Sequence, residues 1–183
     1  MTQGGAADPG ANRRRLDVES LRDSILVISG HLDPKMGGAT IRKFSTYDYD
    51  YAFNSRRRSV YVPMFRGTRM DIFEIFDGAD PNLVTGRRAQ SQVPTQALYL
   101  MNNPWLMEQA DLAAKRMLRS IDDRGVDELV RQVYLRTLCR LPLDTEVRLA
   151  RDFMARFPAA EQEQALGQLF HALFACLDFR YLD

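Results

Sequence analysis

The chain has 183 residues and a formal net charge of +1, with 25 basic and 24 acidic side chains. Its 45% apolar fraction is ordinary for a globular protein and argues against wholesale disorder. The near-neutral balance gives no overall electrostatic case for binding to nucleic acid or to an anionic membrane. No run of about 18 apolar residues appears, which argues against a membrane-spanning helix.

The composition changes once near the start of the chain. Residues 1–12 are rich in Gly and Ala and predict a disordered tail. Residues 13–183 predict a single, mainly α domain with a C-terminal antiparallel helix bundle and a small, partly extended central segment. A division into lobes at 13–103 and 104–183 is the alternative. The N-terminus lacks the basic start and apolar stretch of an export signal, so the chain by itself gives no localisation.

A stripe of apolar residues at alternating three- and four-residue steps predicts the first helix. It consists of Val18, Leu21, Ile25, Ile28 and Leu32. Asp17 is the expected N-cap and Gly30 the expected end. The arginine triplet before it, Arg13 to Arg15, has two interpretations: a solvated entry to the helix or a phosphate-binding site.

The central segment begins with a long connection over residues 33–55. Tyr47, Tyr49 and Tyr51 alternate with aspartates there, which predicts a short edge strand with one aromatic face. Such a face could bind carbohydrate, or it could pack over the core. The β-branched and aromatic residues of 59–65 predict a second short strand, limited by Pro63, which has no amide hydrogen to donate.

Acidic residues and arginines follow in close succession. Met70 to Phe76 predicts a short helix, and Asp71, Glu74 and Asp77 are spaced to lie along one side of it. The sequence Asp80-Pro81-Asn82 predicts a turn. Three of these side chains, Asp77, Asp80 and Asn82, could ligate a cation, but the spacing lacks the glycine and closing glutamate of a calcium loop. Turn chemistry and ion pairs with Arg87 or Arg88 are the other interpretation.

Five further segments have helical periodicity and predict the bundle. They span residues 94–101, 104–119, 127–139, 144–157 and 161–178. Pro94 suits a first turn, and Asn103 and Asp144 are the expected N-caps of the helices that follow them. Ala110, Ala113 and Ala114 should let a neighbouring helix approach closely.

Cysteine and histidine usage gives little support for metal or haem in this segment. Cys139 and Cys176 are 37 positions apart and lack Cys-x-x-Cys spacing. They are expected to be buried free thiols, or a disulfide if the compartment is oxidising. His31 and His171 are the only histidines, and neither follows a Cys-x-x-Cys, so no metal site and no cofactor are expected here.

Five blocks in a fixed order carry a resemblance to a known family. They are RRLDVESLRDSILVISGHLD, RRSVYVPMFR with IFDGADPN, GRRAQSQVPTQALYLMNNPW, LVRQVYLRTLCRLPLDTEV and LFHALFACLDFRYLD. With them, nearly everything after residue 12 resembles the C-terminal domain of large exported planctomycete-type proteins. These proteins also carry cytochrome-c-like domains, and the domain itself is one of unknown function (DUF1553).

The resemblance implies partners and a compartment for a full-length parent. Such a parent has an export signal, a haem-binding cytochrome-like domain and a further uncharacterised domain upstream, so this chain resembles a terminal fragment or a split relative. Haem c would belong to the upstream domains, which are the expected partners, and the parent would be exported or periplasmic. The middle motif of the family has no assigned chemistry. Its candidate polar cluster falls here on Asp77, Asp80, Asn82, Arg87, Arg88, Gln96 and Asn102, with Pro94 and Ala97 also matching.

Three functions therefore stay open. The first is an accessory or structural domain of an exported, haem-associated protein. The second is an enzyme acting on polysaccharide through carboxylates near Asp77 and Asp80, which requires two of them to converge in a pocket and to be free of arginine. The third is nucleic-acid binding by the arginines of 13–15, 56–58 and 87–88.

Overall fold

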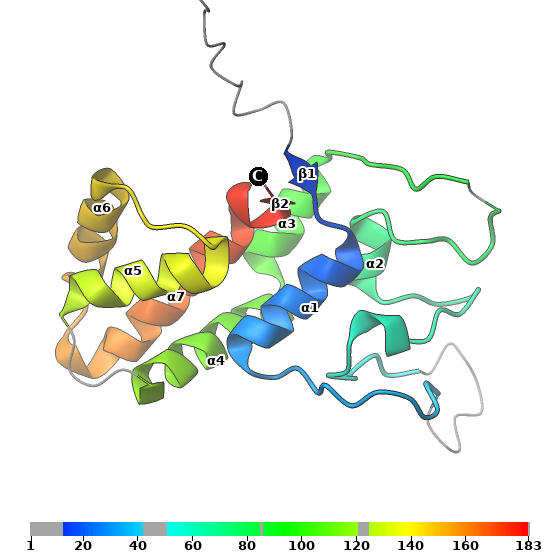
Figure 1. The fold of residues 1–183 in the computed structure, drawn as a ribbon, viewed down its shortest axis with the longest axis horizontal. Helices are drawn as coiled ribbons and strands as arrows, with labels where there is room; N and C mark the ends of the chain where they lie inside the picture. Colours follow the sequence, from blue (N-terminus) through cyan, green and yellow to red (C-terminus); the bar gives the residue numbers. More distant parts are fainter. Residues whose placement is uncertain (1–12, 42–50, 85, 121–124, 183) are drawn as a thin grey trace, which may run out of the picture.

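The computed structural model describes residues 13–41, 51–84, 86–120 and 125–182. The expected tail over 1–12 and the tyrosines at 47 and 49 lie outside these residues. The described chain is mainly α, as predicted (Figure 1). Its α-helices are α1 (Val18–Ser29), α2 (Asp71–Ile75), α3 (Pro94–Asn102), α4 (Pro104–Ser120), α5 (Val126–Leu138), α6 (Asp144–Met154) and α7 (Gln162–Ala175). Short 3-10 turns cover Ser59–Tyr61, Ala159–Glu161 and Asp178–Arg180, and the strands are β1 (Arg14–Arg15) and β2 (Tyr181–Leu182).

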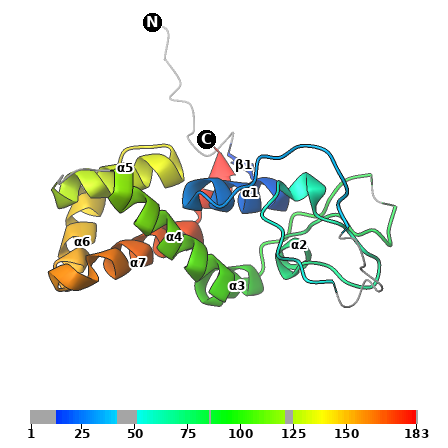
Figure 2. The same cartoon turned by 90° about the horizontal axis from the view of Figure 1, so that it is seen from below.

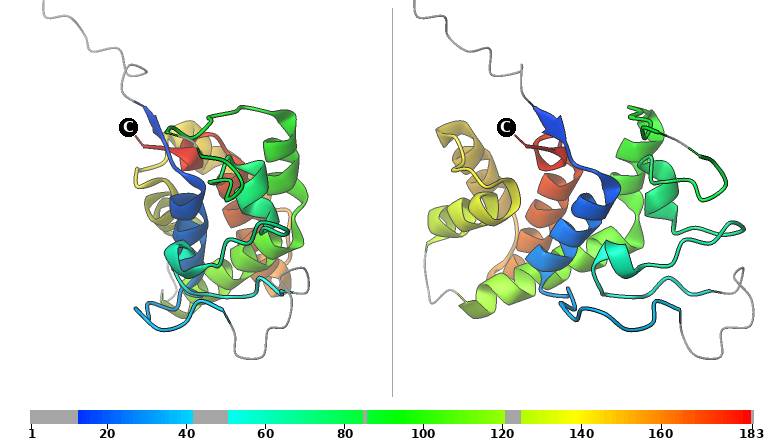
Figure 3. Two further views of the ribbon diagram at one scale, coloured as in Figure 1. Left: turned by 90° about the vertical axis from the view of Figure 1, so that its right-hand side faces the viewer. Right: turned by 45° about the vertical axis from the view of Figure 1, so that its right-hand side comes forward.

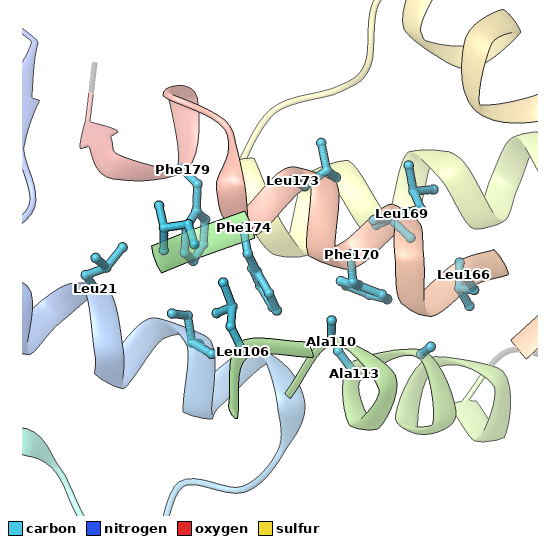
Figure 4. Packing of buried hydrophobic residues seen from close by; sticks show 14 of the residues in the cluster. Leu21, Leu106, Ala110, Ala113, Leu166, Leu169, Phe170, Leu173, Phe174 and Phe179 are labelled. Carbon is cyan, nitrogen blue, oxygen red and sulfur yellow. The ribbon is translucent and has the colours of Figure 1, made fainter. Parts of the chain in front are cut away.

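The core is built on α4 and α7, which make the most extensive helix-to-helix contact. Small side chains of α4, among them Ala110 and Ala113, face Phe170 of α7, and Phe174 packs beside Leu106 (Figure 4). Ala110, Ala113 and Ala114 are at most 2% exposed, which agrees with the predicted close approach of a neighbouring helix. The central pair therefore consists of one small-residue face against one aromatic face.

The remaining helices pack around this pair from two sides. Helix α1 lies on α4, whereas α5 and α6 pack against α7 at the opposite end of the molecule from the long loops (Figure 2). The predicted caps are largely correct: Asp17 accepts a hydrogen bond from the Ser20 amide at 2.7 Å, and Asn103 accepts one from the Trp105 amide at 3.0 Å. Gly30 ends α1 with φ 78°. The prediction for Asp144 was wrong by one position, because Leu143 is the N-cap of α6.

The central segment differs most from its prediction. Residues 59–65 were expected to form a strand, but Ser59–Tyr61 is a 3-10 turn. The cause is a distant residue: the carboxylate of Asp23 on α1 accepts bonds from the Ser59 amide at 2.8 Å and the Ser59 hydroxyl at 2.7 Å. Tyr51 packs edge-on against Phe53 and Phe65, with ring centroids 5.0 and 5.2 Å away.

A two-stranded ribbon joins the two ends of the described chain (Figure 3). The strands β1 and β2 pair antiparallel, with Arg14 opposite Leu182 and Arg15 opposite Tyr181. The Leu16 amide donates to the Arg180 carbonyl at 2.8 Å and extends the ladder by one bond. Part of the arginine triplet is therefore a strand, and Arg15 is half-buried rather than solvated.

Candidate functional site

The candidate polar cluster begins where α2 ends. The Gly78 amide donates to the Phe73 carbonyl at 2.7 Å, which is the long bond of a Schellman ending. Asp77 occupies the left-handed position of this motif, with φ 60°. The prediction that Asp71, Glu74 and Asp77 share one side of a helix was therefore wrong, because α2 stops at Ile75 and the chain reverses at Asp77.

Asp77 is the centre of a hydrogen-bonded network. Its carboxylate accepts bonds from the Ser91 amide at 2.8 Å and the Ser91 hydroxyl at 2.7 Å, and from the Arg15 guanidinium at 3.3 Å. Arg15 also donates to the Ser91 carbonyl at 2.6 Å and to the side-chain oxygen of Gln96 at 3.3 Å. Gln96, which is only 1% exposed, donates to the Ile75 carbonyl at 3.0 Å. This network ties β1, α2 and α3 together.

We expect Asp77→Ala to lower the free energy of unfolding by about 2 kcal/mol, because it leaves the half-buried Arg15 and the Ser91 amide without their charged acceptor. Asp71→Ala is the matched control, since Asp71 is an exposed residue of the neighbouring helix; its effect should stay within about 0.5 kcal/mol. Urea unfolding followed by circular dichroism measures both. Equal stability of the two variants would contradict the structural role of Asp77.

The other acids of the segment point elsewhere. Asp80 accepts a bond from the Asn82 amide at 2.9 Å, as the predicted turn requires, and this bond is the main cause that lowers the pKa of Asp80. Its ion pair is with Arg69 at 3.8 Å, not with Arg87 or Arg88 as predicted. Glu74 also faces Arg69, at 3.7 Å, and its side chain is 63% exposed.

The three remaining members of the cluster do not join the Asp77 network. Arg88 donates to Glu19 on α1 at 2.6 Å, a bond that raises the pKa of Arg88. Arg87 is exposed and has no ion pair within the described part of the chain. Asn102 donates to the Leu98 carbonyl of its own helix at 2.9 Å. The structure thus brings Asp77 and Gln96 into one network and Asp80 and Asn82 into one turn. In the described chain, Arg87, Arg88 and Asn102 are bonded to neither group.

This geometry bears on the two alternative functions. A polysaccharide-cleaving site needs two convergent carboxylates free of arginine. Among the described residues of the segment, Asp77 and Asp80 are each held by an arginine, and Asp71 and Glu74 are exposed on α2. No group of three metal-ligating side chains is found in the described ranges.

The arginine clusters are also used within the fold. Arg13 pairs with Asp178 at 2.8 Å. Arg57 donates to the carbonyls of Lys35, Gly37 and Ala39 and lies over the Tyr61 ring, 4.1 Å from its centroid. Only some of the arginines expected to bind phosphate are therefore available at the surface.

Sequence reasoning missed one arginine that is more deeply buried than any of these. Arg22 is 1% exposed and donates to the carbonyls of Ser55 and Arg57 and to the Ser59 hydroxyl. Burial lowers its pKa, while the adjacent Asp23 raises it. The available signal was its position between Leu21 and Ile25, inside the apolar stripe of α1.

Comparison with known proteins assigns the family. A family profile described as "PSD1: Protein of unknown function (DUF1553)" matches residues 9–154. The chain belongs to this family. The match covers α1 to α6 and ends before α7, so the last of the five quoted blocks lies beyond it. No curated protein and no solved structure matches the chain.

The helical half of this PSD1 chain holds a second charged network. Arg140, at the end of α5, donates to both carboxylate oxygens of Glu146 at 2.8 Å and to Asp178 at 3.1 Å. The bond from Arg140 is the main cause that lowers the pKa of Glu146, and the bond from Arg13 is the main cause that lowers that of Asp178.

A carboxylate whose pKa is lowered by folding stabilises the fold above its unfolded pKa, and this contribution is lost as pH falls through the folded pKa. We therefore expect Arg140→Gln to reduce the free energy of unfolding more at about pH 6 than at about pH 3. Arg148→Gln, at an exposed position of α6, should show no such difference. Urea titrations at both pH values test this. An equal loss of unfolding free energy at both pH values would show that the contribution of Arg140 is not ionic.

An apolar groove lies beside this network, with a volume of about 770 Å³. Helices α3, α4, α5, α6 and α7 all contribute to its walls. Met101, Met107 and Leu149 line it and are 58%, 39% and 70% exposed, so apolar side chains of three helices face solvent together.

The two cysteines are both free thiols. Cys176 lines the groove, and burial raises the pKa of its thiol. Cys139 is exposed and not buried as predicted. No helix of the described residues has the length and apolar character to cross a bilayer.

Proposed function

We propose that this PSD1 chain is a non-catalytic accessory domain of an exported, haem-associated multidomain protein. The observation that carries the proposal is the state of the central acids and arginines. Asp77 is bound by Arg15 and by the Ser91 amide, and Asp80 is bound by Arg69 and by the Asn82 amide. Such internal pairing is what a scaffold requires and a catalytic pair does not. Haem c and the export signal come from the resemblance and belong to the upstream part of the parent.

The partner would be an upstream domain of the same parent, either the cytochrome-c-like one or the uncharacterised one. The groove between α3, α6 and α7 is the surface that fits such a partner, because its lining is apolar and its rim carries exposed methionines. Flexible methionine side chains adapt to an apolar partner surface. An apolar surface of several helices that stays exposed in a single domain marks an interaction site.

The test uses the upstream part of a full-length parent, expressed separately, and measures its affinity for this chain by calorimetry. Met101→Glu combined with Met107→Glu should weaken binding at least about tenfold, since two charges would be buried without partners. Leu141→Glu is the matched control: Leu141 is 62% exposed and does not line the groove. Failure of the unaltered chain to bind, or an equal effect of both changes, would exclude this docking surface.

A further inference from the structure

A second cavity, separate from the apolar groove, lies between α1 and the end of α5. Both helices lie on the same side of the α4 and α7 pair (Figure 2). The cavity has a volume of about 490 Å³, and its apolar walls include Leu16, Leu138 and Leu182. A smaller cavity of about 340 Å³ adjoins it, because Val27, Ile28 and Arg136 line both. The two cavities together form one trench along α1.

Two arginines meet at the end of the trench that the smaller cavity forms. Arg116 and Ser120 are four positions apart on α4, so they lie on the same face of that helix. Arg136 reaches this face from α5, with its two terminal nitrogens 3.5 and 3.4 Å from the Ser120 hydroxyl. Arg116 is oriented by the bond that it donates to the Val27 carbonyl at 2.6 Å. All three side chains line the smaller cavity, so this end holds two guanidinium groups and a hydroxyl.

The unpaired charge of the trench is positive. Two carboxylates line it, those of Asp23 and Asp178. Both are held within the fold by arginines outside the trench, with ion pairs at 3.4 Å for Asp23 and at 2.8 and 3.1 Å for Asp178. Arg58, Arg116 and Arg136 also line the trench, and none of these three forms an ion pair within the described residues. An anionic group would therefore be the first charged partner of either arginine at the narrow end.

We propose that the trench binds a single-chain amphiphile with an anionic head, of the fatty-acid class. The carboxylate accepts bonds from Arg116 and Arg136, and the alkyl chain lies along Val27, Leu138 and Leu182. A guanidinium group is a planar fork of donors that matches a carboxylate. A cavity of about 300–1,000 Å³ with apolar walls and a few convergent polar groups is typical of a small-ligand site.

The two parts of the trench together select this class of ligand. A wholly apolar ligand would leave both guanidinium groups without an anionic partner. A small inorganic anion would leave the apolar walls exposed to water, including Val27 and Leu182, which are 53% and 54% exposed. The inference is independent of the proposed docking groove, since no residue lines both.

Calorimetric titration of the full chain with decanoate, kept below the concentration at which it forms micelles, tests the proposal. One decanoate should bind per chain. Decanol lacks the charge and butyrate lacks the long chain, so each should bind at least about tenfold more weakly. Arg116→Gln combined with Arg136→Gln should lower the affinity for decanoate at least about tenfold. Arg119→Gln is the matched control, because Arg119 is an exposed residue of α4 that lines neither cavity.

Two further measurements locate the alkyl chain. Val27→Ser should weaken decanoate binding about fivefold by removing apolar contact, whereas Leu141→Ser, outside the trench, should have no effect. Cys139 lines the trench and is an exposed free thiol. In a Cys176→Ala variant it is the only cysteine, and decanoate should slow its reaction with Ellman's reagent while butyrate should not.

Three results would overturn the proposal. The first is the absence of saturable decanoate binding by the unaltered chain. The second is equal affinity for decanol and decanoate, which would indicate non-specific association with apolar surface. The third is binding that survives loss of both arginines but is lost in the variant with Met101→Glu and Met107→Glu, which would place the ligand in the groove. Arg116, Arg136 and Val27 are exposed, so circular dichroism should show an unchanged fold in their variants.

Discussion

Replacing Arg22 with methionine should lower the free energy of unfolding by about 3 kcal/mol or more. Methionine keeps most of the volume of the stem but removes every donor. The carbonyls of Ser55 and Arg57 would lose a charged donor that is only 1% exposed, and Asp23 would lose its adjacent positive charge. An unpaired buried polar group costs far more than the net gain from an ordinary hydrogen bond.

The matched control is Arg116→Met. Arg116 also donates to a backbone carbonyl, that of Val27 at 2.6 Å, but it is exposed. Water can replace this donor, so its loss should cost about 1 kcal/mol or less. Urea unfolding gives both values, and hydrogen exchange should show faster opening of residues 51–62 in the Arg22 variant alone. Equal costs for the two substitutions would mean that the buried arginine contributes no more than a surface one.

A chain that ends at residue 157 should fail to fold cooperatively, even though it contains the whole region matched by the PSD1 profile. It lacks α7, whose residues Leu166, Phe170 and Phe174 are at most 1% exposed. Loss of a large buried side chain costs about 3 kcal/mol or more. Three such losses are comparable with the entire stability of a domain, about 5–15 kcal/mol.

Near-ultraviolet circular dichroism and the hydrodynamic radius test this expectation. The shortened chain should lose fixed tertiary signals and expand. Adding a synthetic peptide of residues 158–183 should restore these signals. In the intact chain α7 covers one face of α4, and in the shortened chain this face would be free to bind the peptide (Figure 4). A shortened chain with a sharp unfolding transition of its own would show that α7 is an appendage and not part of the core.

Sequence patterns predicted the helices well because the determining residues are local. Asp17, Gly30 and Asn103 act within a turn or two of their own position, and Ala113 reveals a close helix contact by its size alone. The mainly α class was therefore accessible from the sequence.

The candidate site was harder to predict because its partners are distant in sequence. Arg15 reaches Asp77 across 62 positions, and Arg88 reaches Glu19 across 69. Nothing local distinguishes these pairs from the expected pairing of Asp77 or Asp80 with Arg87 or Arg88. The failed strand at 59–65 has the same cause, since Asp23 holds the Ser59 amide from 36 positions away. The tertiary structure determines which acidic and basic side chains pair, whereas the composition shows only that both kinds of side chain are present in similar numbers.

The ribbon of β1 and β2 has a mechanical consequence. Arg14 lies opposite Leu182, so the outer ends of the two strands are at the same end of the ribbon. A pull applied to both ends of the described chain would open this ribbon like a zipper, one hydrogen bond at a time, instead of shearing all of its bonds together. The ladder should therefore yield at low force, and the bond from Arg15 to Asp77 is a contact on the β1 side that would then bear load.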